Sequence, residues 1–228
     1  MVRRVPMIAA VAVACASGQT PTASADPGPP PGCAPTVVLA VGGTKGPSTP
    51  DSIDPKSPVN AYVAPYQDRP DYLVKFVRYP GGMVAGVNGW DTDLDDSVRI
   101  GADHLRQEIV SDEATCGPAT RYALYGYSQG AIVVRKVATE IDTAGRRGDG
   151  TDLQDRVWVD LIADPAQGVA ARFPGQLLPG ITLPEPATPF THVQSTSECL
   201  PGDMVCDPNG DLAGYATKHT TYQPGGAG

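Results

Sequence analysis

Short apolar runs that alternate with amphipathic stretches constrain this chain more than any other feature. The run Thr36–Val41 (TVVLAV) is apolar or β-branched throughout and ends at a pair of glycines. Similar runs occupy residues 73–79, 122–125 and 157–163. Strands without polar alternation are typical of a parallel sheet that is covered on both faces. We therefore expect buried parallel strands that end in tight loops.

Helical patterns fill the intervals between these runs. Residues 95–110 place Val98, Leu105 and Ile109 on one stripe, and residues 129–141 repeat apolar side chains at the same spacing. The alternation predicts an α/β fold in which helices cover both faces of a parallel sheet. Ligands of such folds bind at the carboxyl ends of the strands, so functional residues should lie in the loops that follow strands.

The first 25 residues have the pattern of a secretory signal peptide. Two arginines precede an apolar stretch (residues 7–16), and residues 23–25 (ASA) form a small-residue cleavage site. The apolar stretch is about half the roughly 20 residues of a membrane span, which disfavours an anchor. A lipoprotein cleaved before Cys15 is a further alternative, although the preceding residues match a lipobox poorly.

A single domain, residues 33–228, is expected after this leader. Residues 26–32 (DPGPPPG) are too rich in proline for helix or sheet, and we interpret them as a tether. The total of 228 residues leaves little room for two full domains. The net charge of −8 disfavours nucleic acid as a partner, because phosphate binding needs clustered cations.

Removal of the leader leaves four cysteines, an even number that indicates two disulfides in an exported domain. Four cysteines allow three pairings. Cys199 and Cys206 flank six residues that include Pro-Gly, which favours a local bridge and leaves Cys33 to pair with Cys116. A zinc site is disfavoured, because the sequence has no C-x-x-C pair and its histidines lie far from both cysteine pairs.

The segment Gly126–Gly130 (GYSQG) matches the G-x-S-x-G pattern between an expected strand and an expected helix. In that context the serine occupies a strained strand-to-helix turn, where glycines on both sides avoid clashes. Ser128 is therefore the candidate nucleophile. Its hydroxyl needs a histidine to take its proton and a carboxylate to orient that histidine.

Three histidines are candidates for this base. His104 lies on the expected helix upstream of the serine, and we interpret it as a surface residue. His192 lies inside residues 190–195, which we expect to form a strand, and a structural role is favoured. His219 lies in a polar, loop-rich stretch after every expected strand, which makes it the best candidate.

The acid should fall between Ser128 and His219 in the chain order of this hydrolase architecture. Asp203 lies within Cys199–Cys206, where a disulfide would hold the carboxylate against an imidazole. Asp164 follows an expected strand, but it could instead cap a helix or turn. Asp203 is the favoured acid and Asp164 the alternative.

Together these motifs resemble the cutinase-like serine α/β-hydrolases, and in detail the PE-PPE-domain branch of that group, from about Cys33 to Tyr222. The shared cutinase features are GYSQG around Ser128, Cys33 and Cys116 just before two strands, C-x-x-G-D-x-x-C around Asp203, and H-x-x-Y from His219. The features of the branch are Gly42-Gly43-Thr44, Asp96-Ser97-Val98 with Gly101, and residues 171–183.

The resemblance implies a cutinase-like α/β-hydrolase fold with a central, mostly parallel five-stranded sheet and helices on both faces. It further implies Ser128 as nucleophile, Asp203 as acid and His219 as base. It also implies an oxyanion hole built from the amide of Gln129 and a donor at Thr44. Cutinases commonly carry a residue pair other than two glycines before that donor, and this departure concerns substrate preference more than chemistry.

The expected function is that of a secreted or cell-envelope-associated serine esterase acting on short to medium, lipid-like acyl esters. No metal or cofactor is needed. Residues 79–90 and 173–190 are apolar loops that could rim the site and contact a lipid surface. We expect a monomer whose partner is a small-molecule or lipid ester. An acyltransferase with the same three residues and a non-catalytic envelope binding protein are the alternatives.

Overall fold

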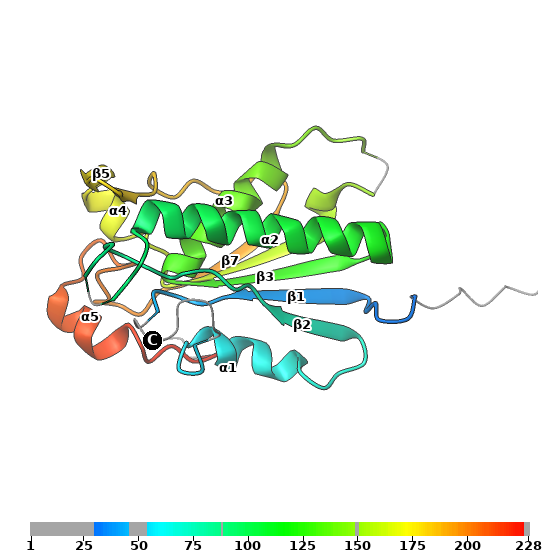
Figure 1. The fold of residues 1–228 in the computed structure, drawn as a ribbon, viewed down its shortest axis with the longest axis horizontal. Helices are drawn as coiled ribbons and strands as arrows, with labels where there is room; N and C mark the ends of the chain where they lie inside the picture. Colours follow the sequence, from blue (N-terminus) through cyan, green and yellow to red (C-terminus); the bar gives the residue numbers. More distant parts are fainter. Residues whose placement is uncertain (1–29, 46–53, 88, 149–150, 226–228) are drawn as a thin grey trace, which may run out of the picture.

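The computed structural model describes residues 30–45, 54–87, 89–148 and 151–225 (Figure 1). The expected signal peptide and most of the tether lie outside these ranges, so the proposed leader and domain boundaries stay predictions. Among the described residues, no helix is both long and apolar enough to cross a membrane.

Five parallel strands form the central sheet in the order β2-β1-β3-β4-β7. Across the sheet they are Tyr72–Phe76, Thr36–Val41, Arg121–Tyr127, Val157–Ile162 and Gln194–Glu198. The predicted α/β fold with a five-stranded sheet is confirmed, and β1 has the predicted bounds. β2 ends earlier than predicted, at Phe76, and the chain leaves the sheet before Pro80, which has no amide to donate to a neighbouring strand.

Helices cover both faces of the sheet (Figure 1). The long helices α2 (Leu94–Cys116) and α3 (Gln129–Thr143) lie on one face, and α1 (Val59–Val63) lies on the other. Helix α5 (Leu212–Lys218) lies at the carboxyl ends of the strands. The shorter elements are η1 (Ala64–Tyr66), η2 (Leu153–Asp155), α4 (Val169–Arg172), β5 (Gly175–Leu178) and β6 (Ile181–Leu183).

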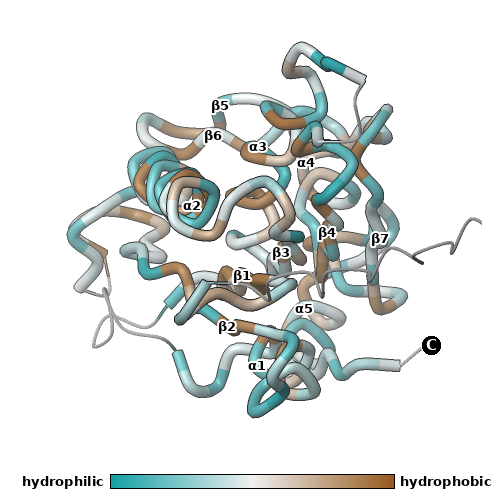
Figure 2. Tube along the Cα trace, turned by 90° about the vertical axis from the view of Figure 1, so that its right-hand side faces the viewer, coloured by the Kyte–Doolittle hydropathy of each residue, from teal (hydrophilic) through white to brown (hydrophobic). Residues whose placement is uncertain are grey.

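Two apolar cores result, one on each face of the sheet, and Figure 2 shows hydrophobic residues along the central strands between the helices. The alternation along β4 assigns its side chains: Val159 and Leu161 enter the core under α2 and α3, while Trp158 and Ile162 enter the core near α1. Since both faces are covered, nearly every residue of β1, β3 and β4 is buried, as their sequences predict.

The strand expected at residues 190–195 is wrong in its bounds, because β7 begins at Gln194. The carboxylate of Asp142, on α3, accepts the amides of Thr191, His192 and Val193 at 2.9, 2.6 and 2.8 Å. This arrangement bends the chain before the strand can start. His192 therefore lies in a bend and is exposed.

Both predicted disulfides are confirmed. Cys33–Cys116 joins the segment before β1 to the last residue of α2, and Cys199–Cys206 closes a loop after β7. The second bridge lies at the carboxyl edge of the sheet, where functional residues were expected.

Candidate active site

Ser128 occupies the sharp turn between β3 and α3. Its backbone has φ 55° and ψ −118°, a left-handed conformation that is strained for a residue with a side chain. The Ser128 amide donates to the carbonyl of Ile162 on β4 at 2.9 Å, which ties the turn to the sheet. The turn thus holds the serine hydroxyl beyond the carboxyl end of the strand.

The glycines around Ser128 are required by close approach. A Cβ at Gly126 would lie 2.7 Å from the carbonyl oxygen of Gly130, and one at Gly130 would lie 2.2 Å from that of Val41. A Cβ at Gly43 would lie 2.9 Å from the Tyr127 ring and 3.1 Å from the Ser128 Cβ. Gly43, directly before Thr44, therefore lets the loop after β1 pass close to the serine.

His219 follows α5 and is buried beside Ser128. Its Nε2 lies 2.9 Å from the Ser128 Oγ, and its Nδ1 lies 2.8 Å from the Asp203 Oδ2. Because a carboxylate only accepts, Nδ1 carries the proton and Nε2 is left to accept from the serine hydroxyl. The rings of Tyr215 and Tyr127 lie 4.8 and 5.2 Å from the imidazole, and the Tyr127 hydroxyl donates to the His219 carbonyl.

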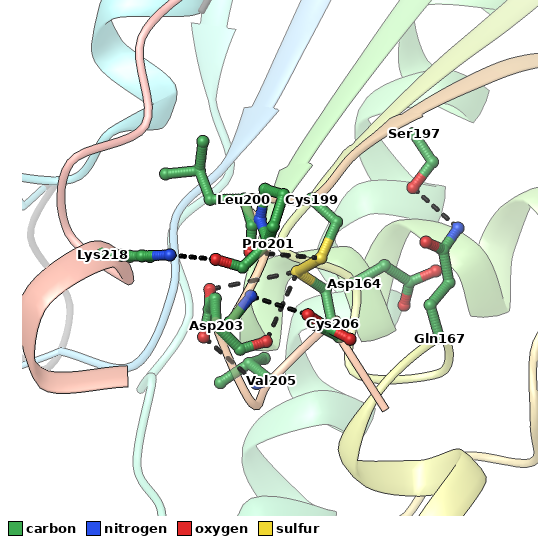
Figure 3. Close-up of a disulfide and its surroundings, with 12 residues drawn as sticks. Asp164, Gln167, Ser197, Cys199, Leu200, Pro201, Asp203, Val205, Cys206 and Lys218 are labelled. Atoms are coloured by element: carbon green, nitrogen blue, oxygen red, sulfur yellow. Dashed lines mark hydrogen bonds between the residues drawn. A yellow bond between two sulfur atoms is a disulfide. The ribbon is translucent and has the colours of Figure 1, made fainter. Parts of the chain in front are cut away.

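Asp203 lies in the loop that the Cys199–Cys206 disulfide closes (Figure 3). Its Oδ1 accepts the Val205 amide at 3.1 Å, and its Oδ2 accepts the Tyr222 hydroxyl at 2.8 Å in addition to His219. Burial raises the pKa of Asp203, but the hydrogen bond and charge of His219, with the Val205 and Tyr222 donors, hold the pKa below its usual value. The carboxylate is therefore kept ionised.

The other candidates have different surroundings. Asp164 is fully buried and accepts the Arg135 guanidinium at 2.9 Å (Nε) and the Ala166 amide at 3.0 Å, so it anchors the chain after β4. The His104 Nδ1 lies 2.6 Å from the Arg78 carbonyl. Both this histidine and His192 are exposed, and neither is hydrogen-bonded to Ser128.

The two expected oxyanion donors lie beside the serine. Gln129 is the first residue of α3, so its amide has no acceptor within the helix. Within the described residues, the Thr44 amide donates to no group of the protein. Thr44 lines the same cavity as Ser128 and His219, and its Oγ1 lies 3.5 Å from the Gln129 Nε2.

A hydrogen-bonded network that the sequence did not reveal holds the Gln129 side chain. Its Oε1 accepts from the Ser97 hydroxyl at 2.9 Å, and its Nε2 donates to the Gly82 carbonyl at 2.7 Å. The Gly82 amide donates back to the Ser97 Oγ at 3.1 Å. Ser97 belongs to the Asp96-Ser97-Val98 motif, and its role depends on a contact between α2 and α3 that periodicity alone does not predict.

The cavity at Ser128, called here the Ser128 cavity, has a volume of about 620 Å³. Apolar side chains form much of its wall, among them Met83, Leu94, Ile132, Pro165, Val169, Leu183 and Val205. The size and lining suit a small organic ligand with an aliphatic part. Among the described residues, no group of three or more His, Cys, Asp or Glu side chains is arranged to hold a metal ion.

Comparison with known proteins gives both a family and a fold. A model of the PE-PPE domain family matches residues 70–223. The carboxylesterase Culp6 homolog of Corynebacterium glutamicum is 28% identical over an alignment of 143 residues, and the match covers 51% of this chain and 44% of that protein. The alignment thus spans less than half of that relative's length.

Two solved structures share the fold at low sequence identity. The catalytic core domain of acetyl xylan esterase from Trichoderma reesei is 17% identical with a TM-score of 0.56, over 83% of this chain and 92% of that one. A cutinase-like protein from Cryptococcus sp. is 15% identical with a TM-score of 0.50, over 82% and 86% of the two chains.

Proposed function

Because this chain belongs to the PE-PPE domain family and has a cutinase-like α/β-hydrolase fold, we propose that it hydrolyses carboxylic esters through Ser128, His219 and Asp203. One observation carries the proposal: the Ser128 Oγ, the His219 imidazole and the Asp203 carboxylate form an unbroken hydrogen-bonded chain that opens on the Ser128 cavity. The carboxylesterase name of the Corynebacterium glutamicum relative supports the same class of reaction.

The reaction proceeds in two acyl-transfer steps. The His219 Nε2 takes the hydroxyl proton as the Ser128 Oγ bonds to the ester carbonyl carbon, and the imidazolium then gives that proton to the departing alcohol. Water attacks the acyl-enzyme in the same way, with its proton passing through His219, and releases the carboxylic acid. The Asp203 carboxylate keeps the imidazole in one tautomer and stabilises its cationic form.

The oxyanion of each tetrahedral intermediate is assigned to the amides of Gln129 and Thr44. Preorganised amides stabilise developing charge without reorganising during the reaction. The side-chain network of Gln129, Ser97 and Gly82 supports this assignment, because it fixes α3 against the loop that faces the serine.

The substrates proposed are esters of short to medium acyl chains, with contact to a lipid surface. The apolar walls of the Ser128 cavity suit an aliphatic chain. Leu212 on α5, Phe173 after α4 and Leu178 on β5 expose apolar side chains, and these elements lie at the same end of the molecule as the carboxyl ends of the strands (Figure 1). Two disulfides and the expected leader support an exported protein, for which we propose a monomeric state.

The test is hydrolysis of p-nitrophenyl esters from acetyl to palmitoyl by the mature protein. Ser128→Ala and His219→Ala should each lose at least about a thousandfold in kcat, while the matched control His192→Ala retains the wild-type rate. Product analysis with an added sugar or lipid alcohol separates hydrolysis from acyl transfer. A wild type that turns over no ester and is not labelled at Ser128 by a fluorophosphonate would contradict the proposal and favour a binding protein.

A further inference from the structure

A second cavity lies against the Ser128 cavity. It has a volume of about 580 Å³ and lies between α2, α3 and residues 182–188. Ile132 and Leu183 line both cavities. These two side chains therefore form the wall that separates the space around the serine from the space beyond it.

Leu183 is held in this wall by the attachment of the β5–β6 hairpin to α2. The Asp95 carboxylate accepts the Thr182 amide at 2.7 Å and the Thr182 hydroxyl at 2.9 Å. The Asp95 amide in turn donates to the Gly180 carbonyl at 3.0 Å. Since Leu183 is the residue next to Thr182, these three bonds fix it over the start of α2.

Ile132 is held by the helix that carries the serine. It lies three residues after Gln129 on α3, one helical turn along the same face. Its distance from Ser128 is therefore fixed by helix geometry. The two halves of the wall thus come from two separate elements, the helix after the nucleophile and the attached hairpin.

Beyond the wall, Val98, Pro184 and Pro186 provide apolar surface on the lining of the far cavity. Six charged residues also line it: Asp95, Arg99, Arg135, Lys136, Glu140 and Glu185. An acyl chain whose carbonyl carbon is at Ser128 meets Ile132 and Leu183 before it can reach this surface. A substrate ester would need the wall to open in order to occupy both cavities.

We propose that Ile132 and Leu183 set the upper limit of acyl-chain length, and that removing either side chain joins the two cavities and admits long-chain esters. The inference rests on the proposed ester hydrolysis and adds to it the residues that determine specificity. Each methylene group of the acyl chain that packs in an apolar site raises kcat/KM for that ester by about tenfold or more. The effect of joining the two cavities is therefore measurable.

The experiment compares kcat/KM for p-nitrophenyl esters of two to sixteen carbons. Leu183→Ala and Ile132→Ala should raise the decanoyl-to-butanoyl ratio of kcat/KM by about tenfold or more. Leu183→Phe thickens the wall and should lower that ratio, which separates a change of specificity from a loss of folding. Val110→Ala is the control, because Val110 is an apolar residue on α2 that is 66% exposed and lines neither cavity.

The two proposals fail in different ways. If the wild type hydrolyses esters and all three wall variants keep its chain-length profile, the wall inference is wrong while the esterase proposal stands. If the wild type is inert toward every ester and toward a fluorophosphonate, the esterase proposal is wrong and the wall inference falls with it. If Leu183→Ala raises the decanoyl-to-butanoyl ratio of kcat/KM and Leu183→Phe lowers it, the result supports both the esterase proposal and the wall inference.

Discussion

Asp160 and Asp203 are both buried, at 6% and 0% exposure, but their surroundings differ in the number of hydrogen-bond donors that they offer to the carboxylate. Asp160 lies in the middle of β4, and its Oδ1 has no hydrogen-bond partner among the described residues. Asp203 lies in a disulfide-closed loop and accepts hydrogen bonds from His219, Tyr222 and the Val205 amide.

The pKa values differ accordingly. Burial raises the pKa of Asp160 to about 6, the charge of Glu198 adds to this, and the Thr196 hydroxyl only partly opposes it. Burial acts in the same direction on Asp203, but its donors outweigh it and the pKa falls below the usual value. Burial therefore sets the cost of a charge, and the number of donors decides whether the charge persists. The hydrogen-bond donors are found at Asp203, the carboxylate that we propose acts in catalysis.

The largest effect is expected from Asp203→Asn. An amide in place of the carboxylate favours the wrong imidazole tautomer and no longer stabilises the imidazolium, so kcat should fall by about 10⁴-fold. The measurement is steady-state hydrolysis of p-nitrophenyl butyrate, with circular dichroism to verify folding. Asp160→Asn should retain the wild-type kcat. A loss below tenfold for Asp203→Asn would show that another carboxylate, with Asp164 the first to test, orients His219.

The next effect concerns the loop that carries Asp203. Replacing Cys199 and Cys206 together by serine should lower the free energy of unfolding by about 2–3 kcal/mol. It should also reduce kcat/KM by about ten- to a hundredfold, because the carboxylate loses its fixed position. Replacing Cys33 and Cys116, a pair with sequence separation 83, should destabilise the fold more but leave kcat of the folded protein unchanged. Equal kcat losses in both double variants would contradict this division.

Asp160→Asn tests the other side of the comparison. The folded state holds the Asp160 proton up to about pH 6 whereas the unfolded chain releases it near pH 4, so stability should fall as the pH rises from about 4 to 6. The pKa difference is worth roughly 3 kcal/mol, and screening by water reduces this to about 1–2 kcal/mol. The variant should be more stable at pH 7 by that amount and should lose this pH dependence. The measurement is urea denaturation of both proteins at pH 4, 5, 6 and 7. The prediction is wrong if the difference in unfolding free energy between the two proteins is the same at every pH.

How much of the fold can be predicted from the sequence depends on whether an element is set by its own residue pattern or by contacts with distant segments. The runs that became β1, β3 and β4 are mostly apolar or β-branched and show no regular polar alternation, so their pattern alone predicted buried parallel strands. β7 (QSTSE) is an exposed polar edge strand, and α5 is a short helix without a periodic stripe. Neither has the pattern that periodicity detects, and both are set by tertiary packing.

The same distinction applies to the candidate site. Ser128, His219 and Asp203 could be selected because motif, chain order and a cysteine-flanked loop each restrict the choice. Their mutual distances, and the donors from Ser97 and Tyr222, depend on contacts between distant segments. The missing donor at Asp160 is likewise invisible in the sequence, where VWVDLI reads as an ordinary strand with one polar residue.

The smallest effect isolates a single donor to Asp203. The Tyr222 hydroxyl donates to the Asp203 Oδ2 and accepts the Leu200 amide at 3.0 Å, so Tyr222 acts as a positioning residue. Tyr222→Phe leaves more charge on the oxygen that faces the imidazolium. The acidic limb of the kcat/KM profile should therefore move upward by about half a pH unit, with a three- to tenfold loss in kcat.

Tyr66→Phe is the matched control for this last variant. It deletes a hydroxyl that is hydrogen-bonded to Tyr125 at 2.8 Å, outside the group of Ser128, His219 and Asp203, so the pH profile should not move. If Tyr222→Phe lowers stability but keeps the wild-type profile, the tyrosine only fills space and satisfies Leu200. A shift confined to Tyr222→Phe would instead show that the donors around Asp203, which Asp160 lacks, adjust the chemistry at Ser128 as well as the fold.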